Sequence, residues 1–313
     1  MASRDGRFAP SPTGTLHLGN LRTALVAWLA ARSAEARFRL RIDDLDRGRS
    51  RPEHEAGQLA DLRALGLEWD GEPLRQSTRD PAYAAAVAEL ERRDLLYPCW
   101  CTRAEIREAA SAPHGDLPEG AYPGTCARLD AAGRAARARA AGDRPPAWRV
   151  RAEAAEVTVE DRVLGPLRGV VDDFVVRRGD GTHAYNLAVV VDDDAQAIGE
   201  VVRGADLASS APRQAWLAAR LGLTVPAYAH VPLVLTPDGR RLAKRDGAVT
   251  LADRRALGET PEQVRGALAA SLGLAPAGSL PSLDELVAGF ALETLRGRGP
   301  TAWAPAAGPL GDG

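Results

Sequence analysis

The sequence has few cysteines and no long apolar run, and both absences exclude classes of protein. Its three cysteines, Cys99, Cys101 and Cys126, form an odd set in one segment, which argues against a disulfide framework. No run of 18 apolar residues occurs, so the sequence predicts no transmembrane helix. The formal net charge of -2 excludes a globally basic surface, so an RNA partner would need a local basic patch.

The start of the chain leaves no room for a signal peptide, because the first predicted strand begins within a few residues of Met1. We therefore expect a cytoplasmic protein with no membrane partner. We also expect a monomer. A length of 313 residues indicates about two domains, and no internal repeat is visible.

Strand and helix patterns alternate along the first part of the chain. Residues 37–42 alternate basic and apolar side chains, which predicts a strand, and residues 52–66 predict a helix. Strands joined by helices form parallel sheets with right-handed crossovers. We therefore predict an α/β fold with a doubly wound parallel sheet.

The same pattern resumes in the second half of the chain. Apolar residues 188–191 and 199–202 are predicted as strands of the parallel sheet. A helix is expected to begin near Ser210, and residues 230–235 are predicted as a last apolar strand. The nucleotide-binding fold is therefore predicted to be split by an insertion.

The insertion contains the cysteines, an Ala/Arg-rich helical run over 127–142 and short strands from Trp148 onward. The chain after Val249 predicts only helices, with capping boxes that begin at Thr260 and Ser282, and its Gly/Pro/Ala-rich end predicts disorder. This organisation divides the chain into the first half of the nucleotide-binding domain (1–96), an inserted α+β domain that holds the cysteines (97–183), the second half of the nucleotide-binding domain (184–250), a helical stub (251–296) and a disordered tail (297–313).

The segment from Arg7 to Asn20 is the most informative part of the sequence. A strand ends there in a turn rich in proline and glycine, and His17 follows at the start of an amphipathic helix. Such a helix start exposes unpaired N–H groups and the positive end of the helix dipole, where a polyphosphate binds. We predict that His17 donates a hydrogen bond to phosphate and that Arg7 and Ser11 contact an acidic substrate.

This segment resembles the first signature of the class I aminoacyl-tRNA synthetases, in the version found in glutamyl-tRNA synthetases. In that version H-[IL]-G-x follows a P-S-P-T-G turn, and Asn20 stands where the general motif has its second histidine. The resemblance covers roughly residues 4–250 and implies the Rossmann-like catalytic domain of that class. It implies that ATP, with Mg²⁺ on its phosphates, binds across His17, Gly19 and Asn20.

A basic turn over 240–248 follows the last predicted strand and resembles the second class I signature, which glutamyl enzymes write as K-L-S-K-R-D-G. The sequence differs from it at Arg241 and Ala243. Formation of an adenylate displaces pyrophosphate, so the site needs a mobile cation where negative charge accumulates. We predict Lys244 as this catalytic cation and Arg241 and Arg245 as further ATP contacts.

Further matches imply a pocket for glutamate. Asp43 occupies the position of a family glutamate that holds the substrate ammonium, although its side chain is one methylene shorter. Tyr185 and Arg203 match a pocket tyrosine and an arginine that binds a substrate carboxylate, and Arg7 could take the second carboxylate. The complete expected glutamate site consists of Arg7, Phe8, Ala9, Pro10, Ser11, Asp43, Tyr185 and Arg203.

The three cysteines form a C-x-C pair followed by a third thiol, which is one ligand short of a tetrahedral zinc site. Tyr122, His114 or water could complete it, and a neutral imidazole is the better ligand in general chemistry. The pattern nevertheless resembles the zinc knuckle of the glutamyl-Q tRNA(Asp) synthetases, in which the tyrosine is a ligand. That resemblance implies Cys99, Cys101, Tyr122 and Cys126 around one structural zinc ion.

The glutamyl-Q enzymes are a truncated branch of the family and lack the anticodon-binding domains of their larger relatives. The resemblance implies ATP-dependent activation of L-glutamate and its transfer to queuosine at the wobble position of tRNA(Asp). Two alternatives stay open: a minimal glutamyl-tRNA synthetase that charges an acceptor end, and a non-catalytic amino-acid- or RNA-binding paralogue. Arginines on the 127–142 run could contact RNA phosphates, namely Arg128, Arg134, Arg137 and Arg139.

Overall fold

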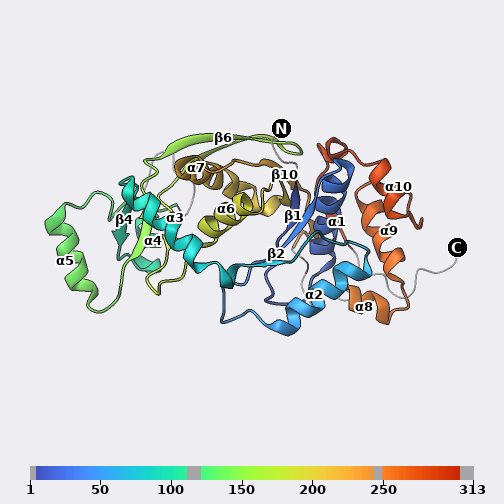
Figure 1. The fold of residues 1–313 in the computed structure, drawn as a ribbon, viewed down its shortest axis with the longest axis horizontal. Helices are drawn as coiled ribbons and strands as arrows, with labels where there is room; N and C mark the ends of the chain where they lie inside the picture. The colour runs from blue at the N-terminus through green and yellow to red at the C-terminus, as the bar shows by residue number, and fades with distance from the viewer. Residues whose placement is uncertain (1–4, 111–120, 241, 243–248, 304–313) are drawn as a thin grey trace.

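A computed structural model describes residues 5–110, 121–240, 242 and 249–303 of the chain. The molecule is elongated, with α5 at one end and α8 to α10 at the other, and the parallel strands β1 and β2 lie between them (Figure 1). Within the described residues, no helix has the length and apolar character needed to span a membrane.

The parallel sheet confirms the predicted α/β class. Strands β1 (Gly6–Phe8), β2 (Phe38–Ile42) and β3 (Leu74–Arg75) pair in parallel in the order β1-β2-β3. Strand β9 (Glu200–Gly204) pairs in parallel with β10 (Ala227–Val231).

These two parts of the sheet meet beside β1. A parallel bridge links Asp5 to Ile198, and the Gly199 amide donates to the Asp5 carbonyl over 2.9 Å. The strands of both parts therefore point their carboxyl ends toward one edge, which is where open α/β sheets bind ligands.

Helix α1 (Leu18–Ser33) forms the centre of the largest apolar core. Leu18, Leu21, Leu25 and Leu29 are fully buried, because the apolar stripe of the helix packs against β1, β2 and β9. The same core takes in residues of α2 (Pro52–Ala64), α8 (Leu251–Ala256), α9 (Pro261–Ser271), α10 (Leu283–Ala288) and the 3-10 helix η4 (Leu292–Leu295). Helix α3 (Asp80–Arg92), which follows the 3-10 helix η1 (Gln76–Thr78), packs in a second core. The predicted capping boxes at Thr260 and Ser282 are present at the starts of α9 and α10.

The prediction of a strand over 188–191 is wrong. These residues lie in helix α6 (Tyr185–Ala195), and Leu187 to Val190 are buried among α3, α7 and the neighbouring strands. A short apolar run has the same appearance in a buried helix and in a buried strand, so periodicity could not separate them. The next helix, α7 (Ala211–Leu221), begins after Ser210 as expected, although the Ser210 side chain makes no capping bond.

Two further predictions need correction at the C-terminal side. The expected strand over 230–235 is divided, because β10 ends at Val231 and the short strand β11 (Val234–Leu235) follows Pro232. The tail predicted to be disordered from Gly297 instead contains β12 (Thr301–Ala302), which pairs in parallel with β11. Residues 304–313 of the predicted tail lie outside the described residues.

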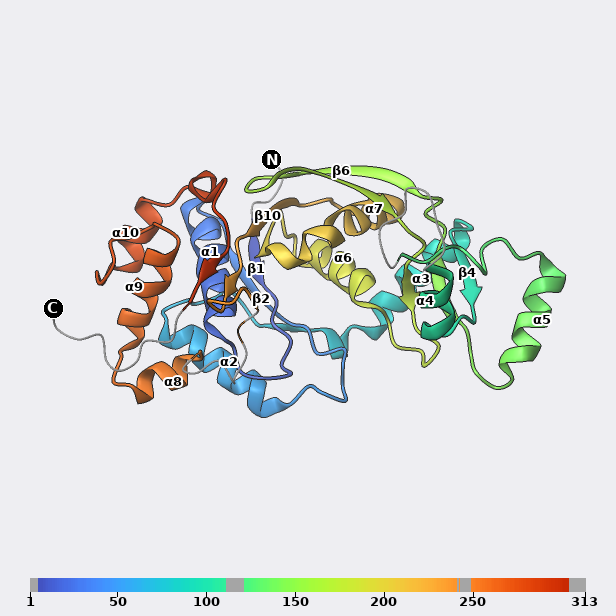
Figure 2. The ribbon, with the colours of Figure 1, turned by 180° about the vertical axis from the view of Figure 1, so that it is seen from behind.

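The inserted segment contributes to two different sheets. Strands β4 (Leu96–Cys99), β5 (Ala147–Val150) and β8 (Val175–Arg177) form a separate antiparallel sheet, accompanied by α4 (Arg103–Ala110) and α5 (Ala131–Ala141). The hairpin of β6 (Ala155–Asp161) and β7 (Gly165–Val171) instead runs along the molecule past α7 and joins β10, as Figure 2 shows. This pairing places Asp161 beside Tyr228, and thus carries a residue of the insertion to the catalytic sheet.

Candidate active site

A cavity of about 410 Å³ opens at the carboxyl edge of the parallel sheet. The loop after β1, the end of β2, the start of α6 and the end of β9 line it. The cavity brings together most of the residues predicted from the first signature and from the glutamate pocket, namely Arg7, Phe8, Ala9, Pro10, Ser11, His17, Gly19, Asn20, Asp43, Tyr185 and Arg203.

Gln58, a residue that sequence reasoning missed, fixes the loop after β1 by hydrogen bonds. Gln58 lies on α2, is 2% exposed, and donates from Nε2 to the carbonyls of Ser11 (3.0 Å) and Gly14 (2.7 Å). The Asp43 amide adds a hydrogen bond of 2.9 Å to the Pro10 carbonyl. A proline-rich segment has few amide donors of its own, so these outside donors fix the shape of the loop.

His17 is the N-cap residue of α1. Its Nδ1 accepts a hydrogen bond from the Asn20 amide (3.3 Å), and Asn20 Oδ1 accepts one from the His17 amide (3.1 Å). Because Nδ1 acts as an acceptor, we assign the proton of the neutral ring to Nε2, which can donate to a phosphate. A Cβ atom at Gly19 would lie 3.0 Å from the His17 ring, so a larger residue at this position would crowd the ring.

The free helix end expected at α1 is partly used by the protein itself. The Leu18 amide donates to the Val249 carbonyl (2.8 Å), and the Asn20 amide is bound by His17. Any phosphate at this end would thus depend more on side-chain donors, such as His17 Nε2, than on these two amides.

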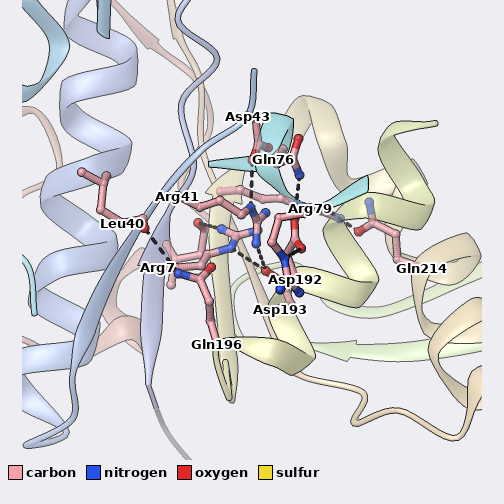
Figure 3. Close-up of polar contacts among 12 residues, drawn as sticks. Arg7, Leu40, Arg41, Asp43, Gln76, Arg79, Asp192, Asp193, Gln196 and Gln214 are labelled. Carbon is pink, nitrogen blue, oxygen red and sulfur yellow. Dashed lines mark hydrogen bonds and ion pairs between the residues drawn. The ribbon is translucent and has the colours of Figure 1, made fainter. Parts of the chain in front are cut away.

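Two arginines and two aspartates form a buried chain of charge beside the cavity. Arg41 donates from Nε to Asp43 (2.8 Å) and from Nη1 to Asp193 (2.5 Å), while Arg7 Nε lies 3.4 Å from the same Asp193 oxygen. Figure 3 shows Arg7 and Arg41 converging on Asp193 from β1 and β2. Arg7 also donates to the Val202 carbonyl (3.1 Å), so much of its guanidinium is occupied by the protein.

The two carboxylates of this chain differ in their acidity. Burial raises the pKa of Asp43 above its ordinary value, and the nearby charges of Arg41 and Arg7 only partly oppose it. Burial also acts to raise the pKa of Asp193, but Arg41 and Arg7 outweigh it and leave that pKa lowered. Asp43 is therefore the carboxylate that would gain more from a further positive group, such as a substrate ammonium.

The neighbouring Asp192 ties α6 to the first half of the catalytic fold. It accepts hydrogen bonds from Gln76 Nε2 (3.1 Å), Arg79 Nε (3.1 Å) and Tyr83 Oη (2.7 Å), and the first two contacts are visible in Figure 3. This attachment also positions Tyr185 at the first turn of α6, where it lines the cavity and stays 39% exposed.

Arg203 differs from the other arginines of the cavity. It is 4% exposed, and it donates to His230 Nε2 (2.9 Å), Gln214 Oε1 (2.7 Å) and the Leu207 carbonyl (3.2 Å). Among the described residues no carboxylate forms an ion pair with it, and burial lowers its pKa. A guanidinium has five N–H donors, so two of them remain for a ligand carboxylate.

The expected contacts of the second signature cannot be placed. Arg241, Lys244 and Arg245 lie outside the described residues, as does His114, the alternative zinc ligand. Leu242 is described, and it is buried in the core around α1.

The three thiols form a second candidate site, and none of them lines the cavity. The sulfur atoms of Cys99, Cys101 and Cys126 lie within 4.8 Å of one another. Tyr122 Oη lies 3.4 Å from Cys99 Sγ and 3.5 Å from Cys101 Sγ, and it accepts a hydrogen bond from the Cys126 amide (2.8 Å). Hydrogen bonds from Cys101 and Cys126 lower the pKa of Cys99, whereas its neighbours Cys126 and Cys99 raise the pKa of Cys101. The closeness of the three sulfur atoms is what allows the cluster to hold a metal ion.

Comparisons with known proteins agree with this geometry. The family model of the catalytic domain of class I tRNA synthetases (E and Q) matches residues 5–283, and the fold and the cavity define this class of enzyme. A glutamate tRNA ligase from Elizabethkingia meningosepticum has a similar structure, with a TM-score of 0.82 and 28% identity over 97% of this chain and 68% of that one.

The curated relatives narrow the class. The glutamyl-Q tRNA(Asp) synthetase of Nocardia farcinica is 61% identical over 271 residues, which is 87% of this chain and 85% of the relative. The enzyme of the same name from Symbiobacterium thermophilum is 50% identical over 302 residues, or 93% of each chain. The chain belongs to the glutamyl-Q tRNA(Asp) synthetase family of class I synthetases.

Proposed function

We propose that this protein activates L-glutamate with ATP and transfers the glutamyl group to queuosine at the wobble position of tRNA(Asp). The observation that carries the proposal is the polarity of the cavity. Arg203 offers a buried guanidinium that no carboxylate of the described residues pairs with, and Asp43 offers a buried carboxylate with a raised pKa. A ligand with both a carboxylate and an ammonium group satisfies the two together.

In this proposal the side-chain carboxylate of glutamate pairs with Arg203, and its ammonium group faces Asp43 directly or through a water. The α-carboxylate then attacks the α-phosphorus of ATP in line, which gives glutamyl-adenylate and pyrophosphate. A hydroxyl of the cyclopentene-diol of queuosine attacks the activated carbonyl and releases AMP. Mg²⁺ binds the ATP phosphates, His17 Nε2 donates to them, and Lys244, with Arg241 and Arg245, supplies positive charge as pyrophosphate leaves.

We further propose that the thiol cluster holds one structural zinc ion with Tyr122 as the fourth ligand. In a tetrahedral site with Zn–S of about 2.3 Å and Zn–O of about 2.0 Å, oxygen and sulfur ligands lie about 3.5 Å apart. The distances from Tyr122 Oη to Cys99 and Cys101, 3.4 Å and 3.5 Å, fit this arrangement. With four protein ligands the site has no open position, so its role is structural rather than catalytic.

The arginines of α5 and of the residues before it are the candidate RNA contacts. Among the α5 arginines, Arg137 pairs with Glu105 (2.8 Å), and no residue of α5 is buried. Helix α5 lies at the end of the molecule opposite α9 (Figure 1). We propose that Arg128, Arg134 and Arg139 bind RNA phosphates. We also propose that the enzyme is cytoplasmic and monomeric.

The decisive experiment measures ATP–pyrophosphate exchange and glutamate incorporation separately. We expect exchange with L-glutamate in the absence of tRNA, and incorporation into tRNA(Asp) only when the tRNA carries queuosine. Glutamine should not replace glutamate, because an amide cannot accept the bidentate pair that a carboxylate accepts. Charging of queuosine-free tRNA at its acceptor end would identify a minimal glutamyl-tRNA synthetase, and absence of any exchange would identify a non-catalytic paralogue.

A further inference from the structure

The cavity contains arginines whose charge is compensated in two different ways. Arg7 and Arg41 contact the carboxylate of Asp193 directly. Within the described part of the chain Arg203 contacts neutral acceptors, and its Nε donates to His230 Nε2 over 2.9 Å. The charge of Arg203 must therefore be stabilised by a group beyond its first contacts, because an isolated buried cation is costly.

One such group is Asp193, which acts on Arg203 through space, and another is Asp161, which is linked to Arg203 through His230. Asp161 Oδ2 lies 2.6 Å from His230 Nδ1, and the side chains of both residues are completely buried. Asp161 comes from the β6–β7 hairpin of the insertion, and His230 comes from β10 of the catalytic sheet. Burial acts to raise the pKa of Asp161, but hydrogen bonds from His230 and from the Leu164 and Val163 amides outweigh it and lower the pKa to about 2.

The contacts determine which nitrogen of His230 carries the proton. Arginine only donates, so His230 Nε2 must be an acceptor and Nδ1 must carry the hydrogen that Asp161 accepts. The result is a chain from the Asp161 carboxylate through neutral His230 to the Arg203 guanidinium. A carboxylate in place of His230 would instead bind Arg203 directly and compete with a ligand carboxylate.

We propose that Asp161 and His230 are positioning residues that orient the Arg203 guanidinium and keep it free for the side-chain carboxylate of glutamate. This inference rests on the proposed binding of glutamate in the cavity. It gives the β6–β7 hairpin a role in amino-acid binding, although the hairpin itself does not line the cavity.

The proposed chain makes glutamate binding sensitive to acid. The charged and titratable groups that face His230 are Asp161 on β6, Arg203 on β9, Tyr228 on β10 and Arg7 on β1. Burial lowers the pKa of His230, Asp161 opposes this, and Arg203 and Arg7 lower it further. Below that lowered pKa, a second proton on Nε2 would face the N–H of Arg203 and break the chain, so the KM for glutamate should rise only at the acid end.

Two substitutions of His230 distinguish a role in positioning Arg203 from a role in the stability of the fold. In His230→Gln, the amide oxygen reaches the position of Nε2 and can accept from Arg203, whereas the contact to Asp161 is lost. In His230→Asn, the amide reaches the position of Nδ1 and can donate to Asp161, whereas the contact to Arg203 is lost. We expect the KM for glutamate in pyrophosphate exchange to rise about tenfold or more in His230→Asn and less than about threefold in His230→Gln, with kcat nearly unchanged in both.

Asp161→Asn tests the other end of the chain. Its amide oxygen stays with the backbone amides of Val163 and Leu164, so its NH₂ group faces both the His230 amide and His230 Nδ1, and the ring proton moves to Nε2, against Arg203. We expect a rise in the KM for glutamate of about tenfold. Asp172→Asn is the control for lost stability, because it changes another buried carboxylate, which pairs with Arg213 (2.6 Å) and accepts from the Tyr122 amide (3.2 Å) but does not touch Arg203.

Nitrogen-15 NMR of the histidine side chains provides a readout that does not need activity. The wild type should show His230 protonated at Nδ1, and Asp161→Asn should show the proton at Nε2. The inference is overturned if His230→Asn and Asp161→Asn keep the wild-type KM, or if KM follows melting temperature alone across all variants and the Asp172→Asn control. A wild-type protein that shows the expected ring proton but no exchange with glutamate would instead contradict the proposed function.

Discussion

The part of the protein around the cavity and the segment around Cys99, Cys101 and Cys126, here called the thiol segment, are stabilised in contrasting ways. Around the cavity, α1 is buried along most of its length in a core shared with β1, β2 and the C-terminal helices. Around the thiols, the described residues form a smaller buried cluster of Tyr97, Cys99, Tyr122 and Cys126, and the adjacent α5 buries no residue. A large apolar core can hold charged groups in place, whereas so small a cluster needs covalent or metal bonds.

The polar groups of the two regions differ for the same reason. The cavity contains buried ion pairs whose geometry depends on strands and helices that the core holds rigid. The thiol segment gathers three sulfur atoms within 4.8 Å of one another, with the Tyr122 phenol oxygen 3.4 Å and 3.5 Å from two of them, inside a small buried cluster. The comparison therefore predicts that damage to one region leaves the other largely intact.

Removal of the metal should have the largest effect, and only on the thiol segment. Structural zinc contributes on the order of 10 kcal/mol to the folding of small zinc modules. We expect one zinc per chain in the purified protein, and we expect chelation or Cys101→Ser to unfold the region of β4, Tyr122 and Cys126. Hydrogen exchange should show loss of protection there and retained protection in α1, with pyrophosphate exchange still measurable.

Freshly purified protein without zinc would rule out the metal site. Cys101→Ser is preferable to substitution of Cys126, because Cys101 is the least buried of the three thiols and its loss disturbs packing least.

Arg203→Ala should have the next largest effect, and only on the cavity. Removing one partner of a buried charge pair costs about 3–5 kcal/mol, which corresponds to a loss of roughly 10²–10³-fold or more in kcat/KM for glutamate. Zinc content and the protection of the thiol segment should match those of the wild type. A variant that retains wild-type kcat/KM would show that another group binds the substrate carboxylate.

Asp43 should produce a smaller effect, confined to the KM for glutamate. Asp43→Ala removes the expected partner of the substrate ammonium, which is present in the ground state and the transition state alike, so KM should rise about tenfold while kcat changes little. Asp43→Glu restores the side-chain length of the larger relatives and should be tolerated. A severe loss in Asp43→Glu would show that Arg41 holds the pocket in a form that only the shorter acid fits.

Asp61→Asn should produce the smallest effect, on stability alone. Asp61 lies on α2, and burial raises its pKa to about 6, with Arg255 opposing the shift. Because the folded pKa is above the unfolded one, the ionised form destabilises the fold as pH rises through the interval between them, and the effect is complete above pH 6. The variant should melt roughly 1–2 °C above the wild type at pH 8 and equally at pH 4, because partial exposure screens the charge.

Several elements could be predicted from the sequence because their signals are local. The strand over 37–42, the helix that follows His17 and the capping boxes at Thr260 and Ser282 depend on residues within one or two turns of each other. The prediction of a strand over 188–191 is wrong because the neighbours of these residues in space, and not their own sequence pattern, make them helical.

The sequence by itself determined the α/β class, the polar residues at the ends of the parallel strands and the set of thiols available for a metal. Only the tertiary structure decided how these groups are held. Gln58 supports the loop after β1 across 44 to 47 residues, and Asp161 reaches His230 across 69. Such contacts depend on strand order and on the path of the β6–β7 hairpin, because a side chain carries no local signal for a partner that only the fold brings near it.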